Sequence, residues 1–242
     1  MYIDFNLILL FKLFLPPLLY VVILYLITPH YKLKLSTILL CFFAGILSTN
    51  LVQIHYALIN MSNLTIFEEC FYSIAPREEI CKFLSYLGVI LILKKQRFNP
   101  VSLMVNMGVV GLGFATFENF FYAMNYGENI LMTRSFTATL AHLIFGLFIG
   151  YWVGLSKINI KKYEIVPTLT SVIHKYKKIK WVLYSLIGLV CAILFHGLWN
   201  YNLYISRGAS LPIMVLMIIF GLWVSKFAFT DLSNQYRKSL GK

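Results

Sequence analysis

Long apolar stretches recur along the whole chain, and they decide the solvent in which it folds. About seven stretches of roughly 18 or more largely apolar residues are present, and each can cross about 30 Å of hydrocarbon at about 1.5 Å per residue. They lie at residues 7–28, 35–59, 74–93, 100–125, 134–156, 181–204 and 209–229. None shows the alternation of a strand, and lipid admits only helices or closed barrels. We therefore predict an all-α polytopic membrane protein of about seven transmembrane helices, with residues 1–242 forming a single integral-membrane domain.

The net charge of +12 is a topology signal, because fifteen of the 21 Lys and Arg residues fall in alternate loops. These residues are Lys32 and Lys34, Lys94, Lys95 and Arg97, the basic residues of 157–180, and Arg237, Lys238 and Lys242. The positive-inside rule places the N-terminus outside, and the C-terminus and the lysine-rich loop 157–180 in the cytoplasm. The basic excess thus indicates contact with the lipid bilayer and no nucleic-acid partner. Abundant Ile, Lys, Asn and Tyr suggest an AT-rich bacterial genome, so we expect a bacterial cell membrane.

Ionisable side chains within the apolar stretches are the main functional candidates, because such groups are costly in hydrocarbon. They are Glu78, Glu79 and Lys82 in the third stretch, Glu118 with Asn119 in the fourth, His142 in the fifth, and His196 with Asn200 in the sixth. One acid or imidazole of each helix lies 15 to 18 residues from its cytoplasmic end. At about 1.5 Å per residue, this places all four about 22–27 Å from the inner face, in the outer leaflet. We expect them to share one cavity.

The spacing on each helix supports such a cavity. Residues four apart share a helix face, so Lys82 lies beside Glu78 and Asn200 beside His196. We expect Lys82 to pair with a glutamate. Glycines at positions 108, 111 and 113 allow a neighbouring helix to approach the fourth stretch closely.

Two imidazoles and up to three carboxylates suit peptide hydrolysis by activated water. One carboxylate takes a proton from water, a second acid or imidazole protonates the leaving nitrogen, and N–H groups stabilise the oxyanion. The same side chains suit Zn²⁺ as well, because two histidines and a glutamate with an open fourth position form a known catalytic pattern. No HExxH motif is present, which excludes a zincin helix. The spacing leaves both mechanisms open.

Four ordered motifs resemble those of the PrsW family of membrane proteases, which is related to the CAAX prenyl endopeptidases of the ABI group. The motifs are Glu78-Glu79-x-x-Lys82, Phe114-x-x-x-Glu118-Asn119, His142-x-x-x-Gly146 and His196-x-x-x-Asn200, within a core of about residues 70–205. The resemblance implies a membrane-embedded protease whose best-known role is the first, outward-side cut of a membrane-anchored anti-sigma factor. The CAAX enzymes have EExxxR and FxxxH where this chain has EExxK and FxxxE, so processing of prenylated substrates is not implied.

The resemblance also implies a role for each motif residue. Glu78 and Glu79 would supply the water-activating base, and Glu118, His142 and His196 would complete the catalytic site. Lys82 and Asn119 would support it, and Asn200 would assist the oxyanion. In a metal-dependent enzyme, Glu118, His142 and His196 would hold the metal, with zinc as the expected ion. A glutamate-dependent enzyme would require no cofactor.

Two other functions are compatible with the same residues. A proton-coupled transporter would use the glutamates and histidines as a proton relay, although neither an inverted repeat nor interrupted helices are evident. An immunity or scaffold protein would use the same fold without catalysis. Loss of proteolysis in variants of Glu79 and His196 would separate a protease from both.

Overall fold

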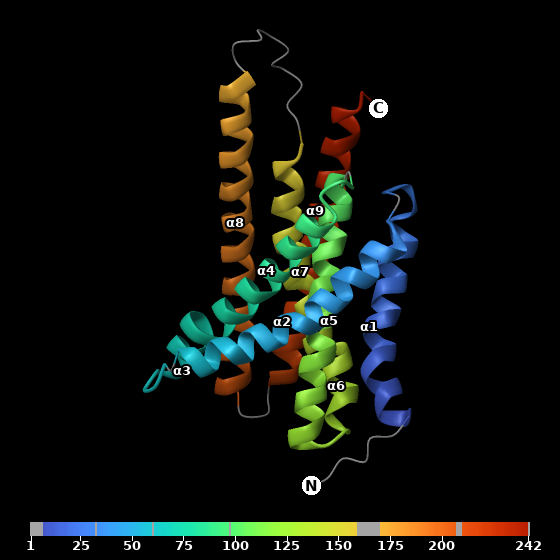
Figure 1. Cartoon of the computed structure of the whole chain (residues 1–242). Coiled ribbons are helices and arrows are strands. Elements are labelled where there is room, and N and C mark those ends of the chain that lie inside the picture. Colours follow the sequence, from blue (N-terminus) through green and yellow to red (C-terminus); the bar gives the residue numbers. More distant parts are fainter. Residues whose placement is uncertain are drawn as a thin grey trace.

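The structure is a computed structural model, and it describes residues 7–31, 33–59, 61–96, 98–158, 170–206 and 210–241. The elements are α1 (Leu7–Ile27), η1 (Pro29–Tyr31), α2 (Leu35–Leu58), α3 (Ile66–Glu68), η2 (Glu69–Ile74), α4 (Ala75–Ile92), α5 (Pro100–Tyr126), α6 (Ile130–Phe136), α7 (Ala138–Ser156), α8 (Thr170–Ile205) and α9 (Ser210–Ser239) (Figure 1). All of these are helices, and no strand occurs within the described ranges. The predicted all-α class is confirmed.

Six helical segments of the described chain are long and apolar enough to cross a membrane. They are α1, α2, α5, α6 together with α7, the part of α8 from Ile179, and α9. The remaining predicted span, α4, has 18 residues and carries Arg77, Glu78, Glu79 and Lys82. The polytopic class is therefore confirmed, while the number of seven crossings stays a prediction. Residues 159–169 of the predicted loop 157–180 lie outside the described residues, and its last part is helical, because α8 begins at Thr170.

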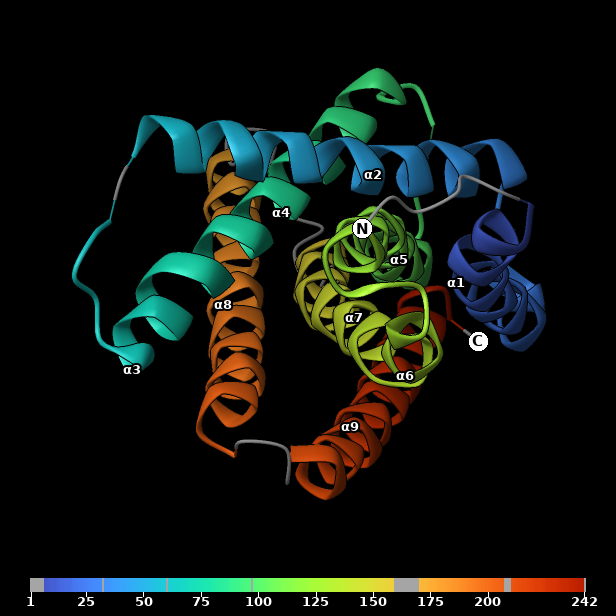
Figure 2. The same ribbon diagram turned by 90° about the horizontal axis from the view of Figure 1, so that it is seen from below.

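Helices α5 and α7 form the centre of the bundle, with α1, α2, α4, α8 and α9 around them (Figure 2). In the apolar window of α5, 94% of the residues are buried, compared with 22% in α1 and 28% in α8. The outer helices expose large apolar side chains such as Leu186 and Ile219. These side chains suit contact with lipid, because a helix that is apolar all round is stable only in a protein core or a bilayer.

Glycines hold α5 and α7 together, as the sequence predicts. A Cβ atom on Gly111 would overlap the carbonyl oxygen of His142, and one on Gly146 would lie 2.5 Å from the carbonyl oxygen of Met107. Only glycine therefore allows the two backbones to approach so closely. The contact at Gly111 fixes the backbone of His142 against α5, the helix that also carries Glu118.

The charged segment of α4 lies inside a longer helical run and not at a free helix end. Thr65 caps this run through its hydroxyl, which accepts from the backbone N–H of Glu68 at 3.3 Å. The π-helical turn η2 then leads directly into α4, with Pro76 in the first turn of α4. The helical run thus begins at Ile66, several residues before the predicted start at residue 74. Such π-helical turns occur often at functional sites.

The segments that carry the basic charge lie at one end of the molecule. In Figure 1, the C-terminal ends of α1, α4, α7 and α9 all lie at the upper end, whereas α1 begins at the lower end. Basic residues follow or complete each of these helix ends. This arrangement agrees with the positive-inside rule, and the orientation in the membrane stays a prediction.

Candidate active site

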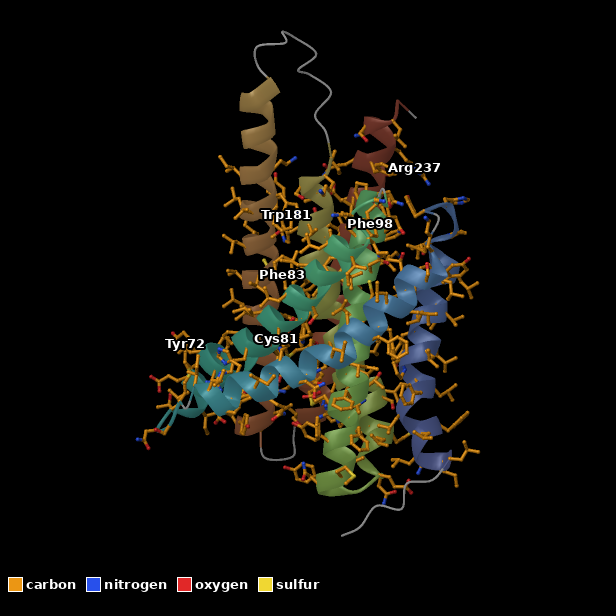
Figure 3. The ribbon with its side chains drawn as sticks, viewed as in Figure 1. Tyr72, Cys81, Phe83, Phe98, Trp181 and Arg237 are labelled. Carbon is orange, nitrogen blue, oxygen red and sulfur yellow. The ribbon has the colours of Figure 1, made fainter. Side chains whose placement is uncertain are left out.

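Five predicted residues from four helices meet in one buried cluster. They are Glu78 and Glu79 of α4, Glu118 of α5, His142 of α7 and His196 of α8. Cys81, which lies between the cluster residues of α4, marks this level in Figure 3. Glu79 is fully buried, and the side chain of Glu118 keeps 20% of its surface exposed. The cluster is therefore largely buried, and its most exposed side chains are those of Glu118 and, at 10%, Glu78.

The Lys82 ammonium lies at the centre of this cluster and is fully buried. Its Nζ donates to Oε1 of Glu79 at 2.5 Å and lies 3.0 Å from Nδ1 of His142. It also lies 4.3 Å from the centroid of the Phe114 ring, a cation–π distance. The expected pairing of Lys82 with a glutamate is confirmed for Glu79, while Oε2 of Glu78 is 4.0 Å away. Because an ammonium only donates, Nδ1 of His142 accepts and the ring proton lies on Nε2.

The proton on Nε2 of His142 points toward Glu118. Nε2 lies 3.0 Å from Oε2 of Glu118, which also accepts from Nη2 of Arg134 at 2.5 Å. Nε of Arg134 donates to Oδ1 of Asn119 at 2.6 Å, and the guanidinium lies 3.5 Å above the Tyr122 ring. A continuous chain of charged hydrogen bonds therefore runs from Arg134 through Glu118 and His142 to Lys82.

The sequence did not point to Arg134 as a member of the site. It lies on the short helix α6, and its charge resembles an ordinary flanking charge at the end of an apolar stretch. One signal was present, because Arg134 is the only basic residue between Glu118 and His142. A buried carboxylate requires a nearby cation, and Arg134 is the cation nearest to Glu118 in the sequence.

His196 binds the other end of the cluster. Its Nδ1 donates to Oε1 of Glu79 at 2.7 Å, and its ring stacks on Phe145 with the centroids 4.6 Å apart. In the neutral imidazole, Nε2 is then an acceptor, and it faces Oε2 of Glu78 at 3.7 Å. Glu79 thus fixes both the ring orientation and the tautomer of His196.

Glu78 differs from Glu79 in what its oxygens contact. Oε2 of both residues is buried without a hydrogen-bond partner in the described part of the chain, but Oε1 of Glu79 accepts from Lys82 and His196. No hydrogen bond from a described residue reaches Glu78. Its polar neighbours are Nε2 of His196 at 3.7 Å and Nζ of Lys82 at 4.0 Å. Glu78 therefore offers a carboxylate oxygen that a reactant can use.

Asn200 lies one turn beyond His196 on α8, as the spacing predicts. Its side chain is half-buried, and no hydrogen bond joins it to the described cluster residues. Its role at the oxyanion stays a prediction.

Three residues lie close enough together to ligate a metal, and in this arrangement two of them are suitable ligands and one is not. Ligand atoms of Glu78, His142 and His196 lie within 4.8 Å of one another. Glu78 and Nε2 of His196 fit, because the Nδ1 proton of His196 is held by a carboxylate, as in many metal sites. His142 does not fit, since Nδ1 accepts from Lys82 and Nε2 donates to Glu118. The predicted set contained Glu118 in place of Glu78, and here Arg134 and His142 both bind Oε2 of Glu118.

Together, the fold and this cluster define a polytopic helical membrane protein with a buried acid–imidazole site of the kind that hydrolases use. The chain belongs to the PrsW family of intramembrane metalloproteases, whose family model matches residues 31–225. The resemblance seen in the four motifs is thereby confirmed.

Individual relatives agree with this family. Protease PrsW of Oceanobacillus iheyensis is 29% identical over 180 residues, which cover 72% of this chain and 74% of the relative. Protease PrsW of Shouchella clausii is 29% identical over 123 residues, or 49% of each chain. Protease PrsW of Bacillus subtilis is 28% identical over 122 residues, or 49% of this chain and 48% of the relative. The chain thus matches about half the length of the last two relatives, and no solved structure matches it significantly. The expected bacterial, multi-pass membrane location is confirmed.

Proposed function

We propose that this chain is an intramembrane protease that hydrolyses a peptide bond of a membrane-anchored protein near the outer membrane face. The observation that carries this proposal is the buried Glu78 carboxylate, which accepts no hydrogen bond from the described residues and whose Oε2 faces Nε2 of His196 at 3.7 Å. Membership of the PrsW family supports it.

Glu78 is the base in this proposal. A water molecule between Oε2 of Glu78 and Nε2 of His196 would donate one hydrogen bond to each, leaving an oxygen lone pair free to attack a carbonyl carbon. Glu78 takes one proton as the new C–O bond forms. It returns this proton to the amide nitrogen as the C–N bond breaks.

Glu79 and Lys82 prepare the site for this reaction. Glu79 holds Nδ1 of His196, so that Nε2 stays an acceptor. The Lys82 ammonium compensates the Glu79 charge and, at 4.0 Å from Oε2 of Glu78, places positive charge where negative charge develops in the tetrahedral intermediate. The chain through His142, Glu118 and Arg134 fixes the position of Lys82. No step is assigned to a metal, because His142 has no nitrogen lone pair free for one in this arrangement.

The substrate that we propose is a single-pass anti-sigma factor, cut at its first, outward site. The resemblance to the PrsW family suggests this class of substrate. The position of the cluster, about 22–27 Å from the cytoplasmic helix ends by residue count, supports a cut in the outer half of the membrane.

The test is cleavage of a candidate single-pass anti-sigma factor by the purified protein in liposomes. Wild type is compared with Glu78→Gln, Glu118→Gln and His196→Ala, and Glu128→Gln serves as the matched control. Glu128 is 41% exposed and pairs with Lys12 at 3.2 Å, away from the cluster. We expect cleavage by wild type and the control, and loss of cleavage by at least about 100-fold in the three site variants.

Each arm is repeated with a zinc chelator. Cleavage that survives chelation supports water activation by Glu78 without a metal. Cleavage that is lost and then restored by zinc overturns the metal-free mechanism while keeping the protease. Site variants that cut as well as wild type would instead favour the transporter or scaffold function.

A further inference from the structure

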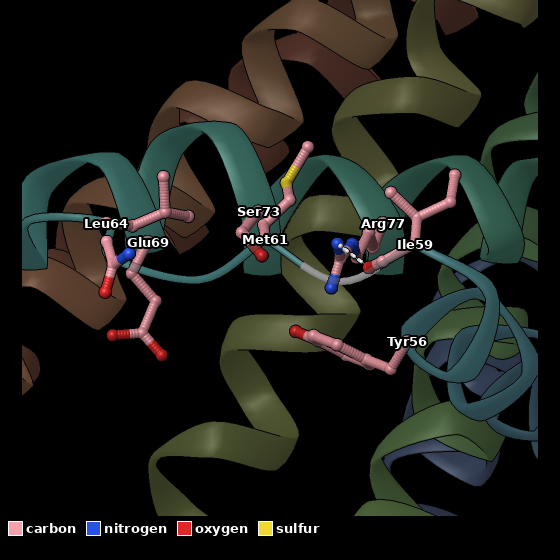
Figure 4. A pocket seen from close by; sticks show the side chains of 8 residues that line it. Tyr56, Ile59, Met61, Leu64, Glu69, Ser73 and Arg77 are labelled. Atoms are coloured by element: carbon pink, nitrogen blue, oxygen red, sulfur yellow. Dashed lines mark hydrogen bonds between the residues drawn. The ribbon is translucent and has the colours of Figure 1, made fainter.

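A polar cavity lies at the N-terminal end of α4, just before the cluster residues Glu78 and Glu79 in the sequence. Its volume is about 280 Å³, and it is a partly open pocket lined by the end of α2, residues 61–64, the turn η2 and the start of α4 (Figure 4). The lining includes Tyr56, Ile59, Leu64, Glu69, Ser73 and Arg77. None of these residues takes part in the hydrogen bonds of the cluster described above. The cavity has the size of one or two amino-acid side chains and is smaller than the usual site of a drug-sized ligand.

Arg77 gives this cavity its charge. The residue is only 5% exposed, and its guanidinium lies 4.2 Å above the ring of Tyr56. Nη2 donates to the carbonyl oxygen of Ile59 at 2.8 Å, whereas Nε has no hydrogen-bond partner in the described chain. The dashed line in Figure 4 marks the bond to Ile59. Arg77 is thus a buried cation with an unused donor.

No carboxylate neutralises this cation. Among the described residues, none forms an ion pair with Arg77, although Glu69 lines the same cavity. In Figure 4 the Glu69 carboxylate points away from the guanidinium. A buried charge without a counter-ion is costly, because the low-dielectric interior replaces its hydration poorly. An anion bound in the cavity would supply the missing counter-charge.

The shape and donors of the cavity suit a carboxylate. A guanidinium is planar and matches the two oxygens of a carboxylate better than an ammonium does. The hydroxyl groups of Tyr56 and Ser73 also belong to the lining, where the Tyr56 hydroxyl interacts with both Ser73 and Arg77. Ser73 lies four residues before Arg77, so both occupy the same side of the helical run.

The position of Arg77 connects the cavity with the proposed reaction. Arg77 directly precedes Glu78 on α4, so the cavity and the proposed base lie at the same helical turn, although the two side chains leave the helix on different sides. We propose that the Arg77 cavity is a specificity subsite that binds an Asp or Glu side chain of the substrate beside the cleaved bond. This inference rests on the proposed protease function. The cavity lies next to the proposed base Glu78, where the substrate would be cut. An acidic side chain of the substrate is therefore a better candidate ligand than the phosphate of a lipid headgroup.

The first test measures cleavage in phosphatidylcholine liposomes. The probes are single-pass reporter proteins in which each position flanking the cleaved bond is in turn Glu or Gln. We expect wild type to prefer Glu at one position by at least about tenfold in kcat/KM, the effect of one charge-assisted hydrogen bond. Arg77→Gln should abolish this preference, and Tyr56→Phe, which keeps the ring under the guanidinium, should reduce it. Arg237→Gln, an exposed arginine at the opposite end, is the matched control and should keep it.

The second test measures binding without cleavage. The blocked peptide acetyl-Ala-Glu-Ala-amide should raise the thermal unfolding temperature of the purified protein, whereas its Gln counterpart should not, and Arg77→Gln should remove the difference. The shift in unfolding temperature tests anion binding in the Arg77 cavity even if no reporter is cut. Its outcome therefore does not depend on whether the protease proposal is correct. Equal shifts with both peptides in wild type would overturn the subsite. Cleavage that ignores the Glu/Gln change but rises with phosphatidylglycerol only when Arg77 is present would also overturn it, in favour of a lipid phosphate.

Discussion

Nδ1 of His196 lies 2.7 Å from Oε1 of Glu79, although 117 residues separate the two in the sequence. The same oxygen accepts from Nζ of Lys82 at 2.5 Å. Glu79 is therefore committed to holding two buried donors, one from α8 and one from its own helix. Its neighbour Glu78 accepts no hydrogen bond at either oxygen from the described residues. In the proposed reaction the two adjacent carboxylates therefore have different roles, the first as a reactant and the second as a positioning group.

This difference predicts that Glu78→Gln and Glu79→Gln fail in different ways. Glu78→Gln should lower kcat by about 10²–10⁴-fold while the free energy of unfolding changes by less than about 1 kcal/mol. Glu79→Gln removes the anion at 2.5 Å from the buried Lys82 ammonium and leaves only Glu78 at 4.0 Å, so it should also lower stability by about 3–5 kcal/mol. Cleavage rates and thermal unfolding of both purified variants check this. Equal stability of the two variants would contradict the assignment.

A second prediction concerns the Lys82–Glu79 pair. Lys82→Met should destabilise the protein by about 3–5 kcal/mol, because it leaves the fully buried Glu79 carboxylate without a cation. The double variant Lys82→Met/Glu79→Gln removes both charges, so it should regain most of this stability and remain inactive. Unfolding measurements on the single and double variants form the test. A double variant less stable than both single variants would show that the pair is not the source of the stability.

Arg134 is predicted to act as a positioning residue. Arg134→Gln should lower kcat by about 10²-fold with little change in KM, since Glu118 then loses the donor at 2.5 Å that holds it toward His142. Arg134→Lys keeps the charge but loses the second hydrogen bond to Asn119, so it should fall between wild type and Arg134→Gln. Steady-state kinetics with Arg237→Gln as the control separate these cases. A rise in KM alone would place Arg134 in substrate binding instead.

The sequence predicted the elements and the members of the site better than their connections. The apolar stretches, the level shared by the acids and histidines, and the glycine contacts of α5 all follow from residue spacing. Spacing on one helix could not show that Lys82 pairs with Glu79, because residues three and four apart are both neighbours on a helix. The choice depends on where Nδ1 of His142 lies, and that position is set by the packing of α7 on α5.

Arg134 and Arg77 show the limit of the sequence more clearly. Each occupies a segment that reads as the polar end of an apolar stretch, where a basic residue needs no explanation. Their burial distinguishes both arginines from ordinary flanking charges. Arg134 lies against Glu118, and Arg77 is 5% exposed without a carboxylate partner among the described residues. Burial of a helix end depends on how neighbouring helices cross over it, which local periodicity does not contain. The extension of the α4 helical run back to Ile66 has a local signal instead, because Thr65 and Glu68 form the capping box that begins it.

The contact between Gly111 and the backbone of His142 gives the last prediction. Gly111→Ala adds a Cβ atom that overlaps the His142 carbonyl oxygen, so α7 must move away from α5. Overpacking of this kind costs about 1–3 kcal/mol, and it also displaces His142 from Glu118 and Lys82. Activity should therefore fall by about 10²-fold, because small displacements of positioned groups have large effects on rate. Gly88→Ala is the matched control, since no atom lies within 4 Å of its added Cβ, and a helical alanine should stabilise it by about 0.5–1 kcal/mol. If Gly111→Ala keeps full activity while losing stability, the position of His142 does not limit the reaction, and the catalytic role proposed for the His142–Lys82 contact is wrong.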